Sequence, residues 1–330
     1  MGSVDKKNVV PNSLGIPSWA SFVIKVKSKA EIQEAIELAK RERLPLIPLG
    51  DGTNTLPRSQ IKAVVMILEL KGIIIETEKL AIQAGENWDE VVKFAVAHEL
   101  SGIEALSGIP GLAGATPIQN IGAYGSEIAD TIESVEVYDK EKEKFLILKK
   151  SECDFSYRNS IFKKNPERFI VTSMTLGLSK EKPKTPDYKD VKKYFAEKNN
   201  NNPSLLEIRE AIINIRKNKL PDPSVIPNAG SYFTNPILEE KVALQIKSQF
   251  PEVPLFPFQN QFKISAGWLI EQVGLKGEMV GKIKIYDKNA LVLTNPEHAT
   301  FEEIREAEET IHQKVFQKFN ITLDREPRII

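Results

Sequence analysis

The chain has 330 residues, of which 41% are hydrophobic and 27% charged, a composition typical of a globular protein with more than one core. Its 45 basic residues equal its 45 acidic residues, which excludes a bulk positive field able to hold nucleic acid or a membrane surface. Cys153 is the only cysteine, so the chain cannot form an internal disulfide and we expect a reducing compartment.

The first ten residues contain no apolar stretch of the signal-peptide type, which together with the lone cysteine predicts a cytoplasmic protein. The remainder of the first half has the pattern of mixed helices and short strands. Two predicted helices, 28–43 and 87–100, begin with capping boxes, Ser28 with Glu31 and Asn87 with Glu90. Short strands are predicted at 46–49, 63–68, 73–76, 81–84, 132–137, 145–148 and 169–178.

A polar segment, 180–203, separates the two halves of the chain, and its asparagines and prolines predict a surface linker or a mobile loop. Helices are predicted beyond it at 204–219, 236–250, 265–273 and 300–319. A strand is predicted at 290–294, and a strand-like run occupies 321–330. Helices and strands mixed in this way indicate an α+β protein.

A glycine-rich loop, Leu49-Gly-Asp-Gly-Thr-Asn-Thr-Leu56, directly follows a predicted strand. Glycines let successive backbone N–H groups converge into a nest for a diphosphate, although an ordinary tight turn has the same composition. The loop is not the dinucleotide fingerprint, because neither a third glycine nor an opening helix follows.

A second glycine-rich stretch, 102–125, follows neither a helical nor a strand period, and irregular stretches of this length inside a domain are usually functional. Its part 108–125 combines small apolar residues with Thr116, Gln119 and Asn120. That composition suits a flat heteroaromatic ring with hydrogen bonds to its edge. A long Ω-loop with packing glycines is the alternative.

Together these loops resemble the FAD-binding elements of the UDP-N-acetylenolpyruvoylglucosamine reductase (MurB) family, in the subclass with a tyrosine-bearing substrate loop. The resemblance begins at Asn12-Ser-Leu-Gly-Ile16 and extends to the C-terminus. It implies an α+β, two-subdomain FAD-binding fold of the vanillyl-alcohol-oxidase (PCMH) type, plus a smaller α+β substrate-binding domain. The implied FAD-binding region is 1–203, in subdomains of about 1–70 and 71–203, with the C-terminal strand 321–330 returning to it. The implied substrate domain is 204–320.

The resemblance implies FAD as the cofactor and NADPH as the co-substrate. The implied FAD contacts are Leu49, Gly50, Asp51, Gly52, Thr53, Asn54, Gly111, Ala115, Thr116, Gln119, Asn120, Gly122, Ala123 and Tyr124. Some flavoenzymes of this fold tether the flavin to a histidine. Because His98, His298 and His312 lie in or beside predicted helices, away from the glycine-rich loops, we expect non-covalent FAD.

Three catalytic residues are implied by the same resemblance. Arg158, in Phe155-Ser-Tyr-Arg-Asn-Ser-Ile-Phe162, would face the substrate carboxylate, and Ser231, in Asn228-Ala-Gly-Ser-Tyr-Phe-Thr-Asn-Pro236, would donate a proton. Glu326 would donate a hydrogen bond as a neutral acid. Without the resemblance, these residues read as an ion-pair donor, a turn serine and a solvated carboxylate.

Substrate contacts are implied at Tyr188, Lys219, Asn235 and Phe256, with Tyr232 as a further candidate. Lys263 and Arg216 are candidate partners for a phosphate or carboxylate, and a solvated surface position is the alternative for both. Phe256 stands where some relatives have a tyrosine. Pro327 replaces the β-branched residue usual in the family, and since proline cannot donate to a ladder, its strand is expected at an edge.

The implied function is NADPH-dependent reduction of UDP-N-acetylglucosamine enolpyruvate to UDP-N-acetylmuramate through FAD, in peptidoglycan precursor synthesis. We expect a monomer with no nucleic-acid, membrane or metal partner. Two alternatives stay open: another FAD-dependent oxidoreductase of the same fold acting on a sugar or alcohol, and a non-catalytic protein that binds FAD or a UDP-sugar. The first needs a base that no histidine supplies here, and the joint presence of three catalytic candidates disfavours the second.

Overall fold

The computed structural model describes residues 3–4 and 8–330, which form two compact units. Unit 1 joins the described residues up to Val9 with Ala20–Asp51 and Lys62–Lys217. Unit 2 joins Val10–Trp19, Gly52–Ile61 and Asn218–Ile330. Part of the stretch used above to predict the absence of a signal peptide, residues 1–2 and 5–7, lies outside the described residues. The predicted division of FAD and substrate binding at residue 203 stays a prediction.

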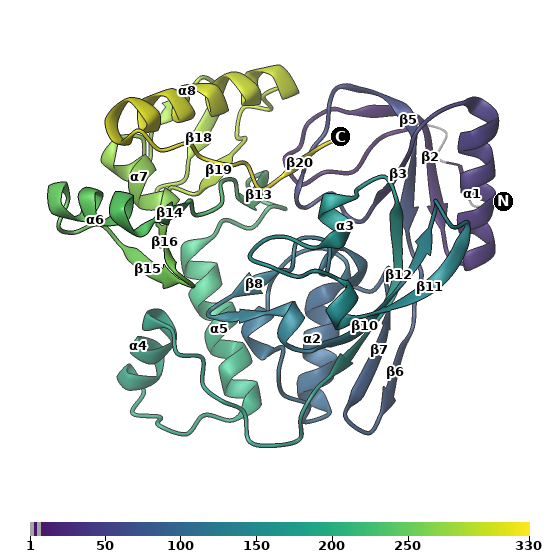
Figure 1. Cartoon of the computed structure of the whole chain (residues 1–330), viewed down its shortest axis with the longest axis horizontal. Helices are drawn as coiled ribbons and strands as arrows, with labels where there is room; N and C mark the ends of the chain where they lie inside the picture. Colours follow the sequence, from purple (N-terminus) through teal and green to yellow (C-terminus); the bar gives the residue numbers. More distant parts are fainter. Residues whose placement is uncertain (1–2, 5–7) are drawn as a thin grey trace. The chain divides into compact units, whose positions relative to one another are not determined.

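One sheet of unit 1 has the strand order β1-β2-β5-β3, with β3 parallel to β5. Helix α1 packs beside this sheet, and its apolar stripe shares a core with the strands (Figure 1). The elements are β1 (Ser3–Val4), β2 (Trp19–Val26), β3 (Leu46–Leu49), β5 (Gln60–Leu68) and α1 (Lys29–Glu42). As predicted, Ser28 caps α1 by accepting from the Glu31 N–H at 3.2 Å. Strand β2 was not predicted.

The second sheet of unit 1 is antiparallel, in the order β11-β10-β12-β7-β6, and α2 packs its apolar face against it. Its strands, all close to the predicted ones, are β6 (Ile73–Glu76), β7 (Lys79–Gln83), β10 (Ile132–Asp139), β11 (Lys144–Lys149) and β12 (Phe169–Gly177). Helix α2 (Trp88–Ala97) buries Trp88, whose indole donates to the Leu106 carbonyl at 3.0 Å.

The stretch 102–125 contains only short 3₁₀ turns, Glu104–Leu106 and Ala113–Ala115, and the two-residue strand β8 (Gly122–Ala123), which pairs with β9 (Ser126–Glu127). The prediction of an irregular stretch is therefore confirmed. The prediction of a loop at 180–203 is partly wrong, because α4 (Lys189–Glu197) lies inside it. Val191 and Phe195 of α4 pack on apolar residues of α5 (Leu205–Lys219). These partners lie outside the polar segment, so its composition alone did not indicate a helix.

Unit 2 has its own core, built between helices and two small sheets. One sheet has the order β13-β19-β18-β17, and the other has the order β14-β16-β15. The strands are β13 (Asn228–Ser231), β14 (Ile237–Glu239), β15 (Leu255–Phe258), β16 (Gln261–Ile264), β17 (Met279–Val280), β18 (Ile283–Ile285) and β19 (Val292–Thr294). The helices are α6 (Glu240–Gln249), α7 (Ala266–Gln272) and α8 (Phe301–Phe319).

The predicted helix 236–250 is too long at its start. Residues 237–239 form β14 instead, because their backbone pairs with β16, with Ile237 opposite Lys263. The α8 prediction is confirmed with its capping box: Thr300 accepts from the Glu303 N–H, and the Glu303 carboxylate accepts from the Thr300 N–H.

The C-terminal segment contributes one short strand, β20 (Arg328–Ile329), which pairs in parallel with β4 (Thr55–Leu56). This pair is a two-stranded sheet, so the edge position expected from Pro327 is confirmed. Within the described part of the chain, none of the helices is long and apolar enough to cross a membrane.

Candidate active site

The first glycine-rich loop has a conformation that only glycine tolerates. Gly52 has a φ of 68°, and a Cβ atom there would lie 2.1 Å from the Pro11 carbonyl oxygen. The Gly52 carbonyl accepts from the Ser13 N–H at 3.2 Å, and the Asn54 carbonyl accepts from the Arg328 N–H at 3.0 Å. A glycine turn fixed through its carbonyl groups suits a nest for a diphosphate. These residues therefore fit the FAD site predicted at 49–54.

Buried polar side chains hold the second loop, 108–125, in place. The Asn120 amide donates to Glu127 at 2.6 Å and accepts from the Ala129 N–H at 3.1 Å. The Thr116 hydroxyl donates to the Ala113 carbonyl at 2.7 Å. Both side chains therefore hold the loop in its folded shape.

Glycine also lets this loop approach the five-stranded sheet closely. A Cβ atom at Gly114 would lie 2.5 Å from the Ala84 side chain, next to β7. Gly111, another predicted FAD contact, has a φ of 114° and accepts from the Trp88 N–H at 3.0 Å. Loop and sheet are therefore packed closely at Gly114.

Arg158 occupies a tight turn in which Ser156 and Asn159 exchange backbone hydrogen bonds of 3.1 and 3.0 Å. Its φ of 52° is unusual for a residue other than glycine and costs on the order of 1 kcal/mol, a form of strain that clusters at functional sites. The half-buried guanidinium donates to the Gly122 carbonyl at 2.8 Å. The structure thus joins Arg158 to the second glycine-rich loop.

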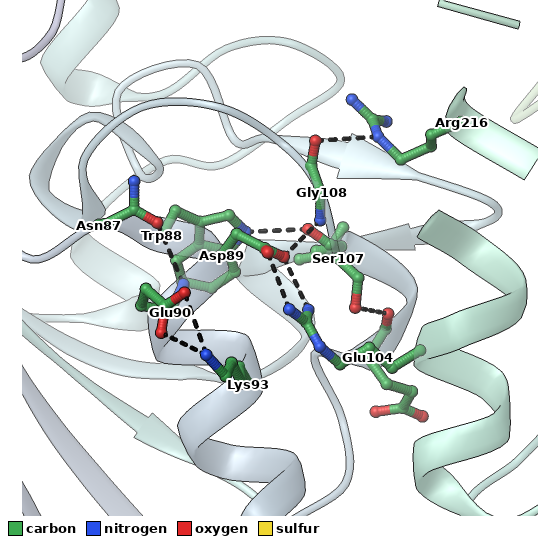
Figure 2. A network of polar contacts seen from close by, with 11 residues as sticks. Asn87, Trp88, Asp89, Glu90, Lys93, Glu104, Ser107, Gly108 and Arg216 are labelled. Atoms are coloured by element: carbon green, nitrogen blue, oxygen red, sulfur yellow. Dashed lines mark hydrogen bonds and ion pairs between the residues drawn. The ribbon is translucent and has the colours of Figure 1, made fainter. Parts of the chain in front are cut away.

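An ion pair anchors the start of this loop (Figure 2). Asp89, in the first turn of α2, accepts from Arg209 of α5 at 2.7 and 2.8 Å and from the Gly108 N–H at 2.6 Å. Burial alone would raise the pKa of Asp89, but the hydrogen bonds from Arg209 and Gly108 lower it below its ordinary value. The Gly108 carbonyl accepts from Arg216 at 3.1 Å, so two helices hold the loop where it begins.

Tyr124 lies at the other end of the loop, and its ring meets that of Tyr188 edge-on, with centroids 5.3 Å apart. Arg216 hydrogen-bonds the Tyr124 hydroxyl, yet burial raises the pKa of Tyr124 to about 12. Arg216, a candidate ligand contact in the sequence, is therefore bound inside unit 1. Tyr188 is 43% exposed and directly precedes α4; that its segment moves stays a prediction.

Ser231 follows a β-bulge. Strand β13 pairs with β19 through Asn228 opposite Thr294 and Ser231 opposite Val292, so β13 carries one extra residue between these pairs. Gly230 in the bulge has a φ of 70°, and its N–H donates to the Asn228 side chain at 2.9 Å. Bulges redirect the side chains beside them and are frequent next to active sites.

Glu326 lies beside this strand, because its N–H donates to the Tyr232 carbonyl at 2.9 Å. A second bond, from the Thr234 N–H to the Asp324 carbonyl at 2.9 Å, keeps the two segments together. Glu326, a predicted catalytic residue, is thus bonded through its backbone to the residue that follows Ser231, another predicted catalytic residue.

Three predicted substrate contacts gather at the sheet β14-β16-β15 of unit 2. Phe256 is 49% exposed and lies opposite Lys263, whose ammonium is 4.5 Å from the centroid of the Phe258 ring. Asn235 accepts a hydrogen bond of 3.0 Å from the first residue of α7. Lys219 is exposed at the end of α5.

Tyr232 is not accessible as a substrate contact, because it is fully buried and its hydroxyl donates to Glu308 at 2.8 Å. Sequence reasoning missed the residues that support the site, among them Asp89, Arg209 and Glu308. One signal was available: Arg209 and Glu308 are charged residues on the apolar faces of α5 and α8.

No metal centre was predicted, and among residues 3–4 and 8–330 no group of three His, Cys, Asp or Glu side chains is placed to hold a metal ion. His98 ends α2, His298 precedes α8 and His312 lies within α8, so the three histidines belong to neither glycine-rich loop.

Comparison with known proteins gives two family models. Residues 222–330 match the C-terminal domain of UDP-N-acetylenolpyruvoylglucosamine reductase, and residues 20–146 match an FAD binding domain. The UDP-N-acetylenolpyruvoylglucosamine reductases of Polynucleobacter asymbioticus and Flavobacterium johnsoniae are 37% and 38% identical to the chain. Each alignment covers 97% of this chain, with 94% and 96% of the relative's length respectively.

A solved structure has the same fold over the whole chain. It is the UDP-N-acetylenolpyruvylglucosamine reductase (MurB) of Thermus caldophilus, with a TM-score of 0.68, 23% identity, and coverage of 100% of this chain and 99% of that one. The predicted α+β FAD-binding fold is confirmed by this match and by the FAD binding domain.

Proposed function

The chain belongs to the UDP-N-acetylenolpyruvoylglucosamine reductase family and is an FAD-dependent oxidoreductase, and we propose that Arg158, Ser231 and Glu326 are its catalytic residues. Its reaction is the NADPH-dependent reduction of UDP-N-acetylglucosamine enolpyruvate to UDP-N-acetylmuramate, in peptidoglycan precursor synthesis. These relatives confirm the resemblance to the family, and the subclass with a tyrosine-bearing substrate loop stays a prediction. Neither alternative reading, an oxidase of a sugar or alcohol or a non-catalytic binding protein, gains support from them.

The obstacle in this reaction is negative charge on the substrate. Its alkene is conjugated to a carboxylate, so a hydride added at the terminal carbon leaves charge on the adjacent carbon and the carboxylate. A fixed guanidinium, Arg158, and a neutral acid, Glu326, stabilise that charge where it develops. Ser231 then gives its proton to the carbon and completes the C–H bond. When bound, FAD supplies the two-electron chemistry that links NADPH to the alkene.

The observation that carries this proposal is the neighbourhood of Ser231 and Glu326. They come from segments almost a hundred residues apart in the sequence, yet the Glu326 N–H bonds the residue that follows Ser231. The bulge before Ser231 adds support, since bulges are frequent next to active sites.

We propose that the two glycine-rich loops hold the non-covalent FAD. The residues proposed to bind the UDP-sugar include Tyr188, Lys219, Asn235, Phe256 and Lys263. We also propose a monomeric, cytoplasmic enzyme with no nucleic-acid or membrane partner. The neutral overall charge and the single, buried Cys153 support this, because neither favours a nucleic-acid partner or an oxidising compartment.

The decisive experiment follows the two half-reactions separately by flavin absorbance in single turnovers. Ser231→Ala is expected to leave reduction of the flavin by NADPH nearly unchanged, because no carbon is protonated in that step. Reoxidation by the enolpyruvyl sugar should slow by roughly 10²–10⁴-fold, the usual value of general-acid catalysis. Equal slowing of both steps, or of neither, would remove Ser231 from the mechanism.

A further inference from the structure

Unit 2 contains a buried carboxylate, Glu308, whose partners are the sequence neighbours of Ser231 and Glu326. Glu308 is on α8, among Ile304, Ala307 and Ile311 of the apolar face that packs into the core, and it is only 3% exposed. An apolar side chain would fill this position without the cost of removing a charge from water. A charge at such a buried position requires strong compensating contacts, and the partners in these contacts indicate the role of Glu308.

Glu308 has partners on both segments that carry the catalytic candidates. Its Oε2 accepts from the Tyr232 hydroxyl at 2.8 Å, and both of its oxygens accept from the Arg325 guanidinium, at 3.0 and 3.1 Å. Arg305, one turn earlier on α8, lies 2.6 Å from Oε1 and completes the set. The carboxylate therefore joins α8, the residue that follows strand β13, and the C-terminal segment at one point.

The two partners of Glu308, Tyr232 and Arg325, are each adjacent in the sequence to a catalytic candidate. Tyr232 directly follows Ser231, and Arg325 directly precedes Glu326. Tyr232 is fully buried, and burial, followed by the adjacent Glu308 charge, raises the pKa of its hydroxyl, which stays a donor. Arg325 also donates through Nε to the Pro327 carbonyl at 3.0 Å, on the other side of Glu326. The backbone on both sides of Glu326 is thus held by the guanidinium that Glu308 binds.

We propose that Glu308 is a positioning residue that fixes Ser231 and Glu326 relative to one another for protonation of the substrate carbon. It touches neither substrate nor cofactor in this role, but acts through Tyr232 and Arg325. The proposal rests on the proposed function, because it presupposes that Ser231 and Glu326 are catalytic. The bond from the Glu326 N–H to the Tyr232 carbonyl, 2.9 Å, is the backbone contact whose geometry the carboxylate would preserve.

The consequence is selective for one half-reaction. Reduction of the flavin by NADPH needs neither Ser231 nor Glu326, whereas reduction of the alkene needs both side chains correctly placed relative to one another. Misplacement of a catalytic group by about 1 Å can cost on the order of 10²-fold in rate. A residue that only stabilised the fold would lower the melting temperature without separating the two steps.

The test uses the FAD-loaded enzyme with Tyr232→Phe, Arg325→Met and Glu308→Gln, and Glu309→Gln as the matched control. Glu309 is the next residue of α8 and is exposed, and its carboxylate accepts from Gln313 of the same helix at 3.0 Å. Tyr232→Phe keeps the buried ring and removes only the hydroxyl, so it should fold even if Glu308→Gln does not.

We expect alkene reduction to slow by about 10- to 100-fold in Tyr232→Phe and Arg325→Met, with flavin reduction within about twofold of the parent. Glu308→Gln added to Tyr232→Phe should cost less than the two separate effects multiplied, because both act through one contact. Amide hydrogen exchange of the peptide containing Glu326 should accelerate in these variants and stay unchanged in Glu309→Gln.

Equal slowing of both half-reactions, unchanged exchange at Glu326, or multiplicative effects in the double variant would each overturn the proposal. Ser231→Ala, measured in parallel, separates this failure from that of the proposed function. If Ser231→Ala selectively slows alkene reduction and the Tyr232 and Arg325 variants do not, only the positioning role of Glu308 is wrong. If Ser231→Ala has no selective effect, the catalytic assignment itself is wrong.

Discussion

Replacement of Asp89 by asparagine should destabilise unit 1 by removing the charge that binds Arg209. The pair is bidentate, at 2.7 and 2.8 Å, and the exposed fractions of the two side chains are 8% for Arg209 and 31% for Asp89. Asparagine has nearly the same shape and can still accept from the Gly108 N–H. The main loss is therefore the compensation of a nearly buried guanidinium.

Breaking a fully buried ion pair by removing one partner costs about 3–5 kcal/mol. Because Asp89 is about one-third exposed, we expect the lower end, about 3 kcal/mol. For a unit of this size each kcal/mol lowers the melting temperature by roughly 2–4 °C, so Asp89→Asn should melt roughly 6–12 °C lower. The stability of the parent should also depend on pH: the lowered pKa of Asp89 gives a contribution present above its unfolded value, about 3.9, and lost as the pH falls through the folded value.

Thermal and urea unfolding of the FAD-loaded protein, followed by flavin fluorescence, measures this loss. Glu143→Gln is the control, since it breaks the exposed pair of Glu143 with Lys40, 2.7 Å apart, and should leave the midpoint unchanged. Replacing both partners, as Asp89→Asn with Arg209→Met, should restore part of the loss, because no uncompensated charge remains. A shift in Asp89→Asn no larger than in Glu143→Gln would refute the reasoning.

Three further outcomes are expected. Gly52→Ala should abolish most FAD binding, because the new Cβ atom would clash with the Pro11 carbonyl; the flavin-to-protein absorbance ratio after purification measures this. Gly274→Ala, at a glycine with a similar φ of 73° but open space around it, should retain the flavin. Equal retention of flavin in both variants would contradict the steric reasoning. Cys153 should resist iodoacetamide at pH 8 until the protein unfolds, since burial raises the pKa of its thiol to about 12; rapid labelling of the native protein would show that the thiol is exposed. Tyr188→Phe should raise the KM for the enolpyruvyl sugar several-fold, as loss of one hydrogen bond implies, and leave flavin reduction by NADPH unchanged; an unaltered KM would remove the hydroxyl from substrate binding.

The sequence predicted best those elements whose signals are local. The caps at Ser28, Asn87 and Thr300 lie within three residues of their partners, and all three helices begin where the capping residues indicate. Strand β2 was missed because its burial does not alternate strictly, with Val23 and Ile24 both buried. Helix α4 was missed because Val191 and Phe195 are its only buried residues.

The residues of the candidate site also divide into those with a local sequence signal and those without one. Its motifs are short and contiguous, so the resemblance could place Arg158, Ser231 and Glu326 in the sequence. The contacts that support them join distant residues: Asp89 meets Arg209 across 120 positions, and Tyr232 meets Glu308 across 76. Such pairs depend on the tertiary fold, and a charged residue on an apolar helix face is the only trace they leave in a single sequence.

The pairing of β20 with β4 has a consequence for biosynthesis. It joins Thr55 to Arg328, residues separated by 328 − 55 = 273 positions. Translation adds about 5–20 residues per second, so the segment that bears Gly52 and Asn54 waits on the order of tens of seconds for its partner. During that interval the Asn54 carbonyl lacks the Arg328 N–H that later fixes it. The nascent chain is therefore expected to acquire its flavin late, after most of its length has left the ribosome.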